Sequence, residues 1–167
     1  TVAFSMGFLA GASPVGEANE QLEAILTAWL DETRLVTLSE LPAWQRLEQT
    51  HLETPLPEII RSLAGTQVRP ALMHGDFAPW NVKVAGGRWT VLDWERGERI
   101  GVPGWDWLHF VLQPAVLVQR ESLPQTLTRL EGLFASLEFG RYARRAQITG
   151  QEWPLTAAYV SFCLRIT

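Results

Sequence analysis

Residues 74–81 read His74-Gly75-Asp76-Phe77-Ala78-Pro79-Trp80-Asn81, and Asp93-Trp94-Glu95 begins twelve residues after Asn81. A carboxylate, an amide and two further carboxylates therefore lie within a short stretch of chain. Mg²⁺ prefers hard oxygen ligands and commonly binds through one or two carboxylates together with phosphate oxygens. Asn81 and Asp93 offer such oxygens, which leaves Asp76 free to accept the proton of a hydroxyl group. The spacing therefore predicts a site that holds Mg²⁺ and a nucleotide phosphate beside an acceptor hydroxyl.

Short strands are predicted on both sides of this segment. An apolar run, Ala71 to Met73, ends at the motif, and residues 81–85 alternate in polarity as a strand does. Gly86-Gly87 is typical of a two-residue hairpin turn before a second strand over residues 89–94. Because the two arms of this hairpin are nearly equal in length, we expect the amide and the second aspartate to lie side by side and share one cation.

The motif resembles the catalytic segment of kinases. A protein kinase has His-Arg-Asp, four further residues and Asn, followed later by Asp-Phe-Gly, whereas this chain has His-Gly-Asp with the same spacing and later Asp-Trp-Glu. With these differences, residues 71–113 resemble the aminoglycoside phosphotransferase and choline kinase family. The resemblance implies an α+β, mainly helical fold, equivalent to the carboxyl-terminal lobe of a protein-kinase-like phosphotransferase with a short catalytic β-hairpin.

The resemblance also implies roles for the motif residues. Asp76 would be the catalytic base, and His74 would belong to the same catalytic segment and orient its backbone through the ring nitrogens. Asn81 and Asp93 would bind Mg²⁺ and, with it, ATP. Glu95 would support these ligands or bind a second metal ion.

A further aspartate follows in Gly104-Trp105-Asp106-Trp107, which resembles the family's aspartate at the start of a helix. The resemblance implies that Asp106 braces the catalytic loop. The chain has only four aspartates, and three of them fall within residues 76–106, which favours a clustered site. The alternative is that Asp76 and Asp106 are ordinary turn and helix-cap residues, since aspartate is favoured at both places.

The kinase mechanism needs parts that this chain does not show. It uses a glycine-rich loop over the phosphates and a lysine on a strand of an amino-terminal lobe. Lys83 is the only lysine and lies two residues after Asn81, and no lysine-bearing strand follows the glycine-rich residues 7–16. We therefore expect residues 1–167 to form one domain, the carboxyl-terminal lobe, with the nucleotide-cradling lobe missing or supplied by a longer parent chain or a second chain.

The rest of the chain is expected to be helical. Apolar residues recur at helical spacing, and several segments begin with a serine, threonine or proline that suits a helix start. The last predicted helix has no visible stop signal, so we expect either that the chain was truncated there or that this helix packs on something absent. The predicted helices cover residues 17–35, 41–52, 55–63, 105–118, 123–137 and 154–166.

Eight tryptophans invite the hypothesis of an aromatic cage. Stacked aromatic rings bind cations, and Trp80 and Trp105 are the candidates beside the motif that could contact a cationic acceptor. Core packing is the competing interpretation for these residues. His109 lies four residues after Trp105, and we interpret it as a packed or capped histidine and not as a ligand.

Charge and composition narrow the class of protein. The net charge of -4 and the scattered arginines argue against a nucleic-acid partner. Cys163 is the only cysteine, which indicates a buried thiol in a reducing compartment. No apolar stretch approaches the ~20 residues of a membrane span, and residues 1–12 lack the basic start of a secretory signal. We therefore expect a cytoplasmic protein without a membrane partner.

Two hypotheses of function follow. The first is an ATP-dependent phosphotransferase that acts on a hydroxyl of a small molecule such as an aminoglycoside, choline or a related amino alcohol or sugar. The second is a truncated, non-catalytic lobe that acts as a binding module. A serine hydrolase is excluded, because no Gly-x-Ser-x-Gly segment is present. The identity of the acceptor, the nucleotide preference and the oligomeric state are not encoded in any motif that we recognise.

Overall fold

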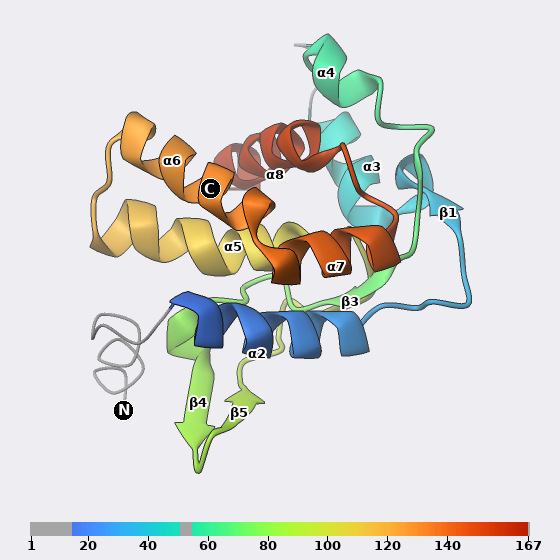
Figure 1. Ribbon diagram of the computed structural model, residues 1–167. Coiled ribbons are helices and arrows are strands. Elements are labelled where there is room, and N and C mark those ends of the chain that lie inside the picture. The colour runs from blue at the N-terminus through green and yellow to red at the C-terminus, as the bar shows by residue number, and fades with distance from the viewer. Residues whose placement is uncertain (1–14, 51–54, 167) are drawn as a thin grey trace.

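The computed structural model describes residues 15–50 and 55–166 (Figure 1). Helices dominate these residues, and the strands form only small antiparallel sheets, so the fold class is α+β. Among the described residues, no helix combines the length and apolar character needed to cross a membrane. The helices are α2 (Val15–Ala28), η1 (Leu38–Glu40), α3 (Pro42–Gln49), α4 (Glu58–Arg61), η2 (Pro79–Asn81), α5 (Trp105–Gln113), η3 (Pro114–Val118), α6 (Leu123–Ala135), α7 (Leu137–Ala146) and α8 (Glu152–Ile166).

In the described part of the chain, six short strands pair in three antiparallel sheets. β3 carries the chain into the motif and pairs with β6, which begins three residues after Glu95. The sequence analysis predicted β3 but not β6, because Glu98-Arg99-Ile100-Gly101 has no clear strand pattern by itself. The strands are β1 (Val36–Thr37), β2 (Gln67–Val68), β3 (Ala71–Met73), β4 (Val82–Ala85), β5 (Arg88–Val91) and β6 (Glu98–Gly101).

The predicted hairpin is confirmed as β4 and β5. Val82 pairs with Val91, and the register continues to the turn at Gly86-Gly87. Both glycines have positive φ, 56° and 74°, the conformation that the favoured two-residue hairpin turn requires. The second arm is shorter than predicted, because Asp93 has a φ of 64° and leaves the strand conformation. Figure 1 shows the hairpin projecting from the helical body beside α2.

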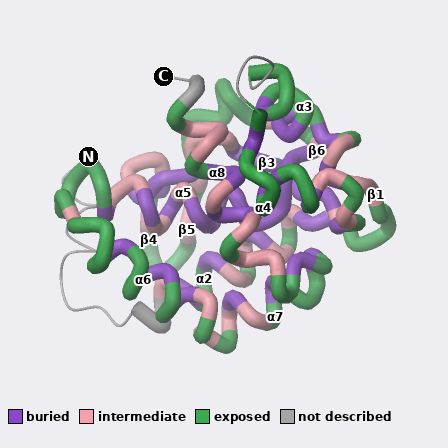
Figure 2. Tube along the Cα trace, turned by 90° about the horizontal axis from the view of Figure 1, so that it is seen from above, coloured by how far each residue is buried: buried purple, intermediate pink, exposed green. Residues whose placement is uncertain are grey.

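The core lies between the helices and the motif. α2 packs along α7, and α5 contacts both α2 and α8. Figure 2 shows that buried residues are concentrated along α5 and the neighbouring β3. Trp107 on α5 is fully buried, and its ring packs edge-on against Phe139 and Tyr142 of α7. α5 is therefore held firmly on several sides, which matters because it carries Asp106 and His109.

The helix predicted over residues 17–35 ends earlier, at Ala28. The backbone oxygen of Trp29 accepts a hydrogen bond from the Leu72 N–H at 2.8 Å, so the chain joins β3 and leaves the helix. Asp31 then forms a turn in which its carboxylate accepts bonds from the backbone and hydroxyl of Thr33. Asp and Thr compete with helical bonding in this way, a local signal that the apolar periodicity concealed.

The helix predicted over residues 123–137 is confirmed as α6, which ends two residues earlier at Ala135, and the following helix α7 was not predicted. Ser136 separates them with extended backbone, and its hydroxyl accepts a bond from the Phe139 N–H as a helix cap. The spacing of Leu130, Phe134 and Leu137 runs across this break in the sequence, although Leu137 is exposed at the start of α7, so periodicity alone does not reveal the break.

Four other helix boundaries differ from prediction. Pro114 has no N–H for helical bonding, and the turn from Pro114 widens into the π-helix η3 at the end of α5. Residues 55–57 are not helical, so α4 begins only at Glu58.

α3 ends at Gln49, and the last two residues of the helix predicted there, 51 and 52, lie outside the described residues. α8 begins at Glu152, two residues before the predicted start.

A buried hydrogen bond connects the start of α5 to α7. Gly104 has a φ of 87°, and its N–H donates to the hydroxyl of fully buried Tyr142 at 2.8 Å. We expect Tyr142→Phe to lower the free energy of unfolding by about 1–3 kcal/mol, because the buried N–H loses its acceptor. Urea denaturation of the two proteins measures this difference. Equal stability would mean that the bond contributes little to holding α5.

Candidate active site

The His-Gly-Asp loop of the motif is held by one carboxylate on α5. Asp106 Oδ2 accepts a hydrogen bond from the His74 N–H at 2.6 Å, and Oδ1 accepts one from the Gly75 N–H at 3.1 Å. Burial raises the pKa of Asp106 to about 7, while the two N–H groups act in the opposite direction by stabilising the charged form. The structure thus places Asp106 where the sequence analysis expected a brace for the loop.

His74 connects the same loop to the end of the hairpin. Its Nδ1 accepts a bond from the Asp76 N–H at 3.2 Å, and its Nε2–H donates to the Leu92 carbonyl at 2.8 Å. These two partners require the tautomer that carries its proton on Nε2. The ring is fully buried and packs against Trp94, with 4.6 Å between the ring centroids. His74 therefore fixes the backbone at Asp76 and does not face a substrate.

The motif has Gly75 where protein kinases have an arginine. It has a φ of 79°, and a Cβ built there would lie 2.7 Å from the backbone oxygen of Arg96. A side chain would therefore be strained by its conformation and blocked by backbone. The close approach lets the loop pack against the chain that follows Glu95.

Both carboxylate oxygens of Asp76 have a donor. The Nε2–H of His109 donates to Oδ1 at 2.9 Å, and Nδ2 of Asn81 donates to Oδ2 at 3.2 Å. A carboxylate has about four lone-pair positions, so one remains free on each oxygen. The side chain of Asp76 is 36% exposed. The group is thus fixed in orientation and still open to a hydroxyl donor.

His109 is in turn oriented by α8. Its Nδ1 lies 2.8 Å from the hydroxyl of Tyr159, a residue 50 positions away. Burial lowers the pKa of His109 and raises the pKa of Tyr159, so the ring is neutral at ordinary pH and the tyrosine keeps its proton. Tyr159 therefore donates to Nδ1, which leaves the His109 proton on Nε2, facing Asp76. The sequence analysis missed this contact; the available signal was that His109 lies three residues after Asp106, on the same helix face.

The proposed ligands for the metal lie at the base of the hairpin. Nδ2 of Asn81 also donates to the Asp76 carbonyl at 2.8 Å, so the amide oxygen of Asn81 points the other way. The Leu92 N–H donates to the Asn81 carbonyl at 2.8 Å, so the pairing of the two hairpin arms extends to these residues. Asp93 directly follows Leu92 and is therefore close to Asn81. Within residues 15–50 and 55–166, no side chain or backbone group bonds to the Asp93 or Glu95 carboxylates. These hard oxygens fit Mg²⁺.

Glu95 does not complete a larger metal cluster. Among the described residues, no group of three or more His, Cys, Asp or Glu side chains gathers as a metal site. Mg²⁺ keeps several waters and takes phosphate oxygens, so a pair of protein ligands is sufficient for it. Asn81 and Asp93 therefore stay the predicted ligand pair, and the supporting role of Glu95 also stays a prediction.

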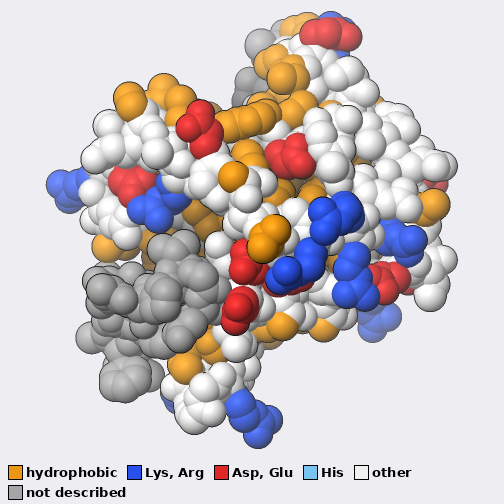
Figure 3. Space-filling model, viewed as in Figure 1, with side chains coloured by type: hydrophobic (Ala, Val, Ile, Leu, Met, Phe, Trp, Pro, Cys, Tyr) orange, Lys and Arg blue, Asp and Glu red, His pale blue; other side chains and the backbone are white. Residues whose placement is uncertain are grey.

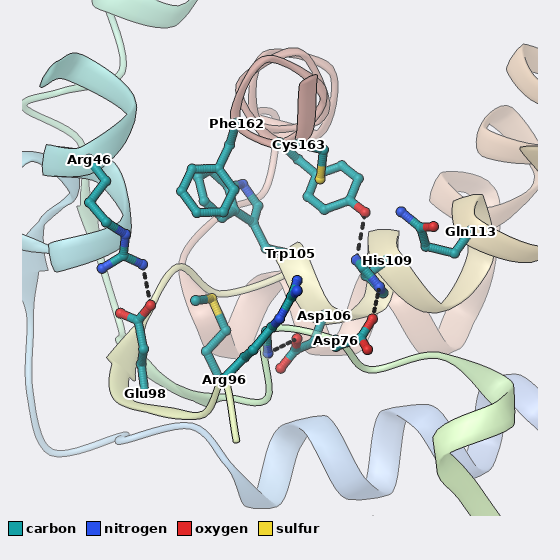
Figure 4. A pocket seen from close by; sticks show the side chains of 13 residues that line it. Arg46, Asp76, Arg96, Glu98, Trp105, Asp106, His109, Gln113, Phe162 and Cys163 are labelled. Carbon is teal, nitrogen blue, oxygen red and sulfur yellow. Dashed lines mark hydrogen bonds and ion pairs between the residues drawn. The ribbon is translucent and has the colours of Figure 1, made fainter. Parts of the chain in front are cut away.

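A cavity of about 430 Å³ opens beside Asp76 (Figure 4). α8 supplies an aromatic wall, and Arg46 of α3 pairs with Glu98 of β6 across the far side. Arg96 also faces this cavity. The sequence analysis singled out none of the three charged residues. The lining residues are Arg46, Met73, Gly75, Asp76, Arg96, Glu98, Trp105, Asp106, His109, Gln113, Tyr159, Phe162 and Cys163.

The two tryptophans predicted as a cage are not assembled at this cavity. Trp105 contributes to the wall but is 2% exposed, with its ring 4.9 Å from that of Phe162 and stacked on Trp44. Trp80 is not among the residues that line the cavity. Core packing, the competing interpretation, explains Trp105. Cys163, expected to be fully buried, is partly buried and lines the cavity.

Comparison with known proteins adds one match. A model of the Phosphotransferase enzyme family matches residues 9–146, which includes the whole motif and α5 but not α8. No curated protein and no solved structure matches the chain.

The raised pKa of Asp106 makes stability depend on pH. Between pH 3.8 and about 7, the folded protein binds a proton at Asp106 that the unfolded chain does not bind. The contribution of Asp106 is therefore greatest at the acid end and is lost as pH rises through about 7. We expect the free energy of unfolding to fall by on the order of a few kcal/mol relative to Asp106→Asn across this window.

Urea denaturation at a series of pH values checks this expectation. The other titratable groups are common to both proteins, so the difference between them isolates Asp106. A difference that does not vary with pH would show that the two N–H bonds outweigh burial and keep the carboxyl ionised throughout.

Proposed function

Because this chain belongs to the phosphotransferase enzyme family, we propose that it transfers the terminal phosphoryl group of ATP to a hydroxyl group of a small molecule. The observation that carries this proposal is the orientation of the Asp76 carboxylate and its position at a cavity. Its carboxylate is oriented by His109 and Asn81 and lies at the edge of a cavity of about 430 Å³. That is the arrangement a general base for a bound hydroxyl requires.

Asp76 would align the acceptor and take its proton. A free lone pair on the carboxylate accepts the hydroxyl hydrogen, which directs the oxygen lone pair away from Asp76 toward the phosphate side of the site. The proton passes to the carboxylate as the oxygen attacks. His109 and Asn81 prevent the carboxylate from rotating, and the neutral His109 ring adds no positive charge that would weaken the base.

Asn81 and Asp93 would hold the magnesium salt of ATP through the Asn81 amide oxygen and the Asp93 carboxylate. Bound Mg²⁺ would neutralise charge on the phosphate oxygens during transfer. The bond from Asn81 Nδ2 to Asp76 then has a second consequence. It ties the ligand for the metal to the base for the acceptor, so that the two halves of the site keep a fixed separation.

We further propose that residues 1–167 correspond to the carboxyl-terminal lobe of a protein-kinase-like phosphotransferase. The helical body, the short hairpin and the braced His-Gly-Asp loop support this assignment. The nucleotide would then be covered by an amino-terminal lobe on a longer parent chain or on a second chain. Aminoglycosides, choline and related amino alcohols or sugars are candidate acceptors by family, although Arg96 and Arg46 at the cavity do not favour a polycation.

Binding of ATP tests the metal site without the acceptor. We expect calorimetry to show Mg²⁺-dependent ATP binding that weakens by an order of magnitude or more in Asp93→Ala, because a carboxylate ligand is lost. Asp31→Ala removes an aspartate whose carboxylate is bonded to Thr33 within its own turn, and it is the matched control, for which binding should be unchanged. Equal binding by Asp93→Ala and the control would contradict the proposed site. Absence of binding by all three proteins would favour the non-catalytic binding module.

Because His109, held by Tyr159, orients Asp76, we expect substitutions of Asp76 and of His109 to lower turnover by different amounts. General bases contribute about 10²–10⁴-fold, so Asp76→Ala should lose most of this factor and His109→Ala a part of it. Slow hydrolysis of ATP, with water as the acceptor, serves as the assay.

His109→Gln keeps an N–H donor and should recover part of the loss, with the ATP dissociation constant unchanged in each variant. If His109→Ala retained full turnover, the orienting role of this residue would be wrong. If His109→Ala and His109→Gln were equally impaired, the loss would reflect packing and not the hydrogen bond.

A further inference from the structure

A second hollow lies behind the cavity at Asp76. It has a volume of about 540 Å³ and is bounded by the end of α5, η3, α6 and α8; we call it the α6–α8 groove. Its lining residues are Leu112, Gln113, Val116, Leu117, Glu121, Leu123, Thr126, Leu127, Leu130, Trp153, Thr156, Ala157, Tyr159, Val160, Cys163 and Leu164.

The groove gathers exposed apolar side chains. Thirteen large hydrophobic residues are exposed in the described part of the chain, and seven of them line this groove. Leu123 is 71% exposed and Leu164 is 73% exposed. Figure 3 shows hydrophobic side chains collected over α6 and toward α8. An apolar concentration of this kind marks a binding surface, because soluble proteins rarely leave one in contact with water.

The few polar groups of the groove are already satisfied. The hydroxyls of Thr126 and Thr156 each donate to a backbone oxygen one helical turn earlier, and Glu121 is paired with Arg129. The remaining polar side chains of the lining, Gln113, Tyr159 and Cys163, are the three that also line the cavity beside Asp76, and the other walls are apolar. The part of a ligand that lies here must therefore be hydrocarbon.

The groove adjoins the cavity beside Asp76, because Gln113, Tyr159 and Cys163 line both spaces. Figure 4 shows Gln113 and Cys163 close to His109, on the side of the cavity formed by α5 and α8. These three side chains form the boundary between the two spaces, so an acceptor that passes them would have its hydroxyl at Asp76 and its remaining atoms in the groove.

α8 provides a wall of the groove that lies outside the residues matched by the family model. Tyr159, Val160, Cys163 and Leu164 all follow residue 146, where the family match ends. The membership shown by residues 9–146 therefore does not specify what this wall accepts.

We propose that the acceptor is an amphipathic alcohol, with its hydroxyl at Asp76 and an apolar body in the α6–α8 groove. This inference rests on the proposed phosphotransferase function, which it extends by naming the acceptor's chemical class. The polar cavity binds the hydroxyl end of the acceptor, and the groove selects acceptors by the length and hydrophobicity of their apolar part.

Primary alcohols of increasing length test the groove directly. We expect the dissociation constants of ethanol, butanol, hexanol and octanol, measured by calorimetry or ligand-observed NMR, to fall by about fourfold for each methylene group, the factor for burying one methylene. Leu127→Lys puts a charge into the groove from a partly exposed helix position and should abolish this dependence on length. Leu137→Lys changes an exposed leucine outside the groove and should leave it intact.

Three outcomes would overturn the proposal. Affinity could be independent of chain length, or the dependence could survive in Leu127→Lys. Alternatively, sedimentation could show that the wild-type and Leu137→Lys proteins are dimers while Leu127→Lys is a monomer, in which case a second copy of the chain occupies the groove. Failure of the proposed function would give a different result from these three. Mg²⁺-dependent ATP binding would be absent, while the dependence of alcohol affinity on chain length persisted. The groove would then be a site for lipophilic ligands without phosphoryl transfer.

Discussion

The buried carboxylate of Asp106 holds the catalytic loop through the N–H groups of His74 and Gly75. A loop with a positive φ at Gly75 has few bonds of its own, so it needs an acceptor from another element. α5 supplies that acceptor from its first turn, and the burial of Trp107 and Tyr142 behind it prevents the helix from shifting. The position of Asp76 depends on this arrangement, because its backbone directly follows the two braced residues.

The same helix acts on Asp76 a second time through its side chain. His109 lies one turn after Asp106, and Tyr159 on α8 determines which ring nitrogen of His109 carries the proton. Asn81 approaches the carboxylate from the hairpin side. Asp76 is therefore supported by three elements, α5, α8 and the η2 turn, while one lone pair on each oxygen stays available. Rigid support around an exposed reactive group is what orientation of a hydroxyl acceptor requires.

The site has two chemically different sides. The hairpin side presents the oxygens of Asn81 and Asp93, which suit a hydrated cation and phosphate. The α8 side presents an aromatic wall and then an apolar groove in which the hydroxyls of Thr126 and Thr156 are already bonded to backbone. Asp76 lies between these sides, at the boundary where a hydroxyl attached to an apolar body would meet a phosphate.

The spacing of His74, Asp76, Asn81 and Asp93 is present in the sequence itself, and the Gly86-Gly87 turn follows from the backbone preference of two adjacent residues, so the sequence by itself determined both. It could not reveal β6, the break between α6 and α7, or the contact between His109 and Tyr159, which are 50 positions apart. Apolar periodicity records which face of a helix is buried but not which partner covers it. Only the packing of α5 against α8 decided that His109 orients the Asp76 carboxylate and that an apolar groove adjoins this site.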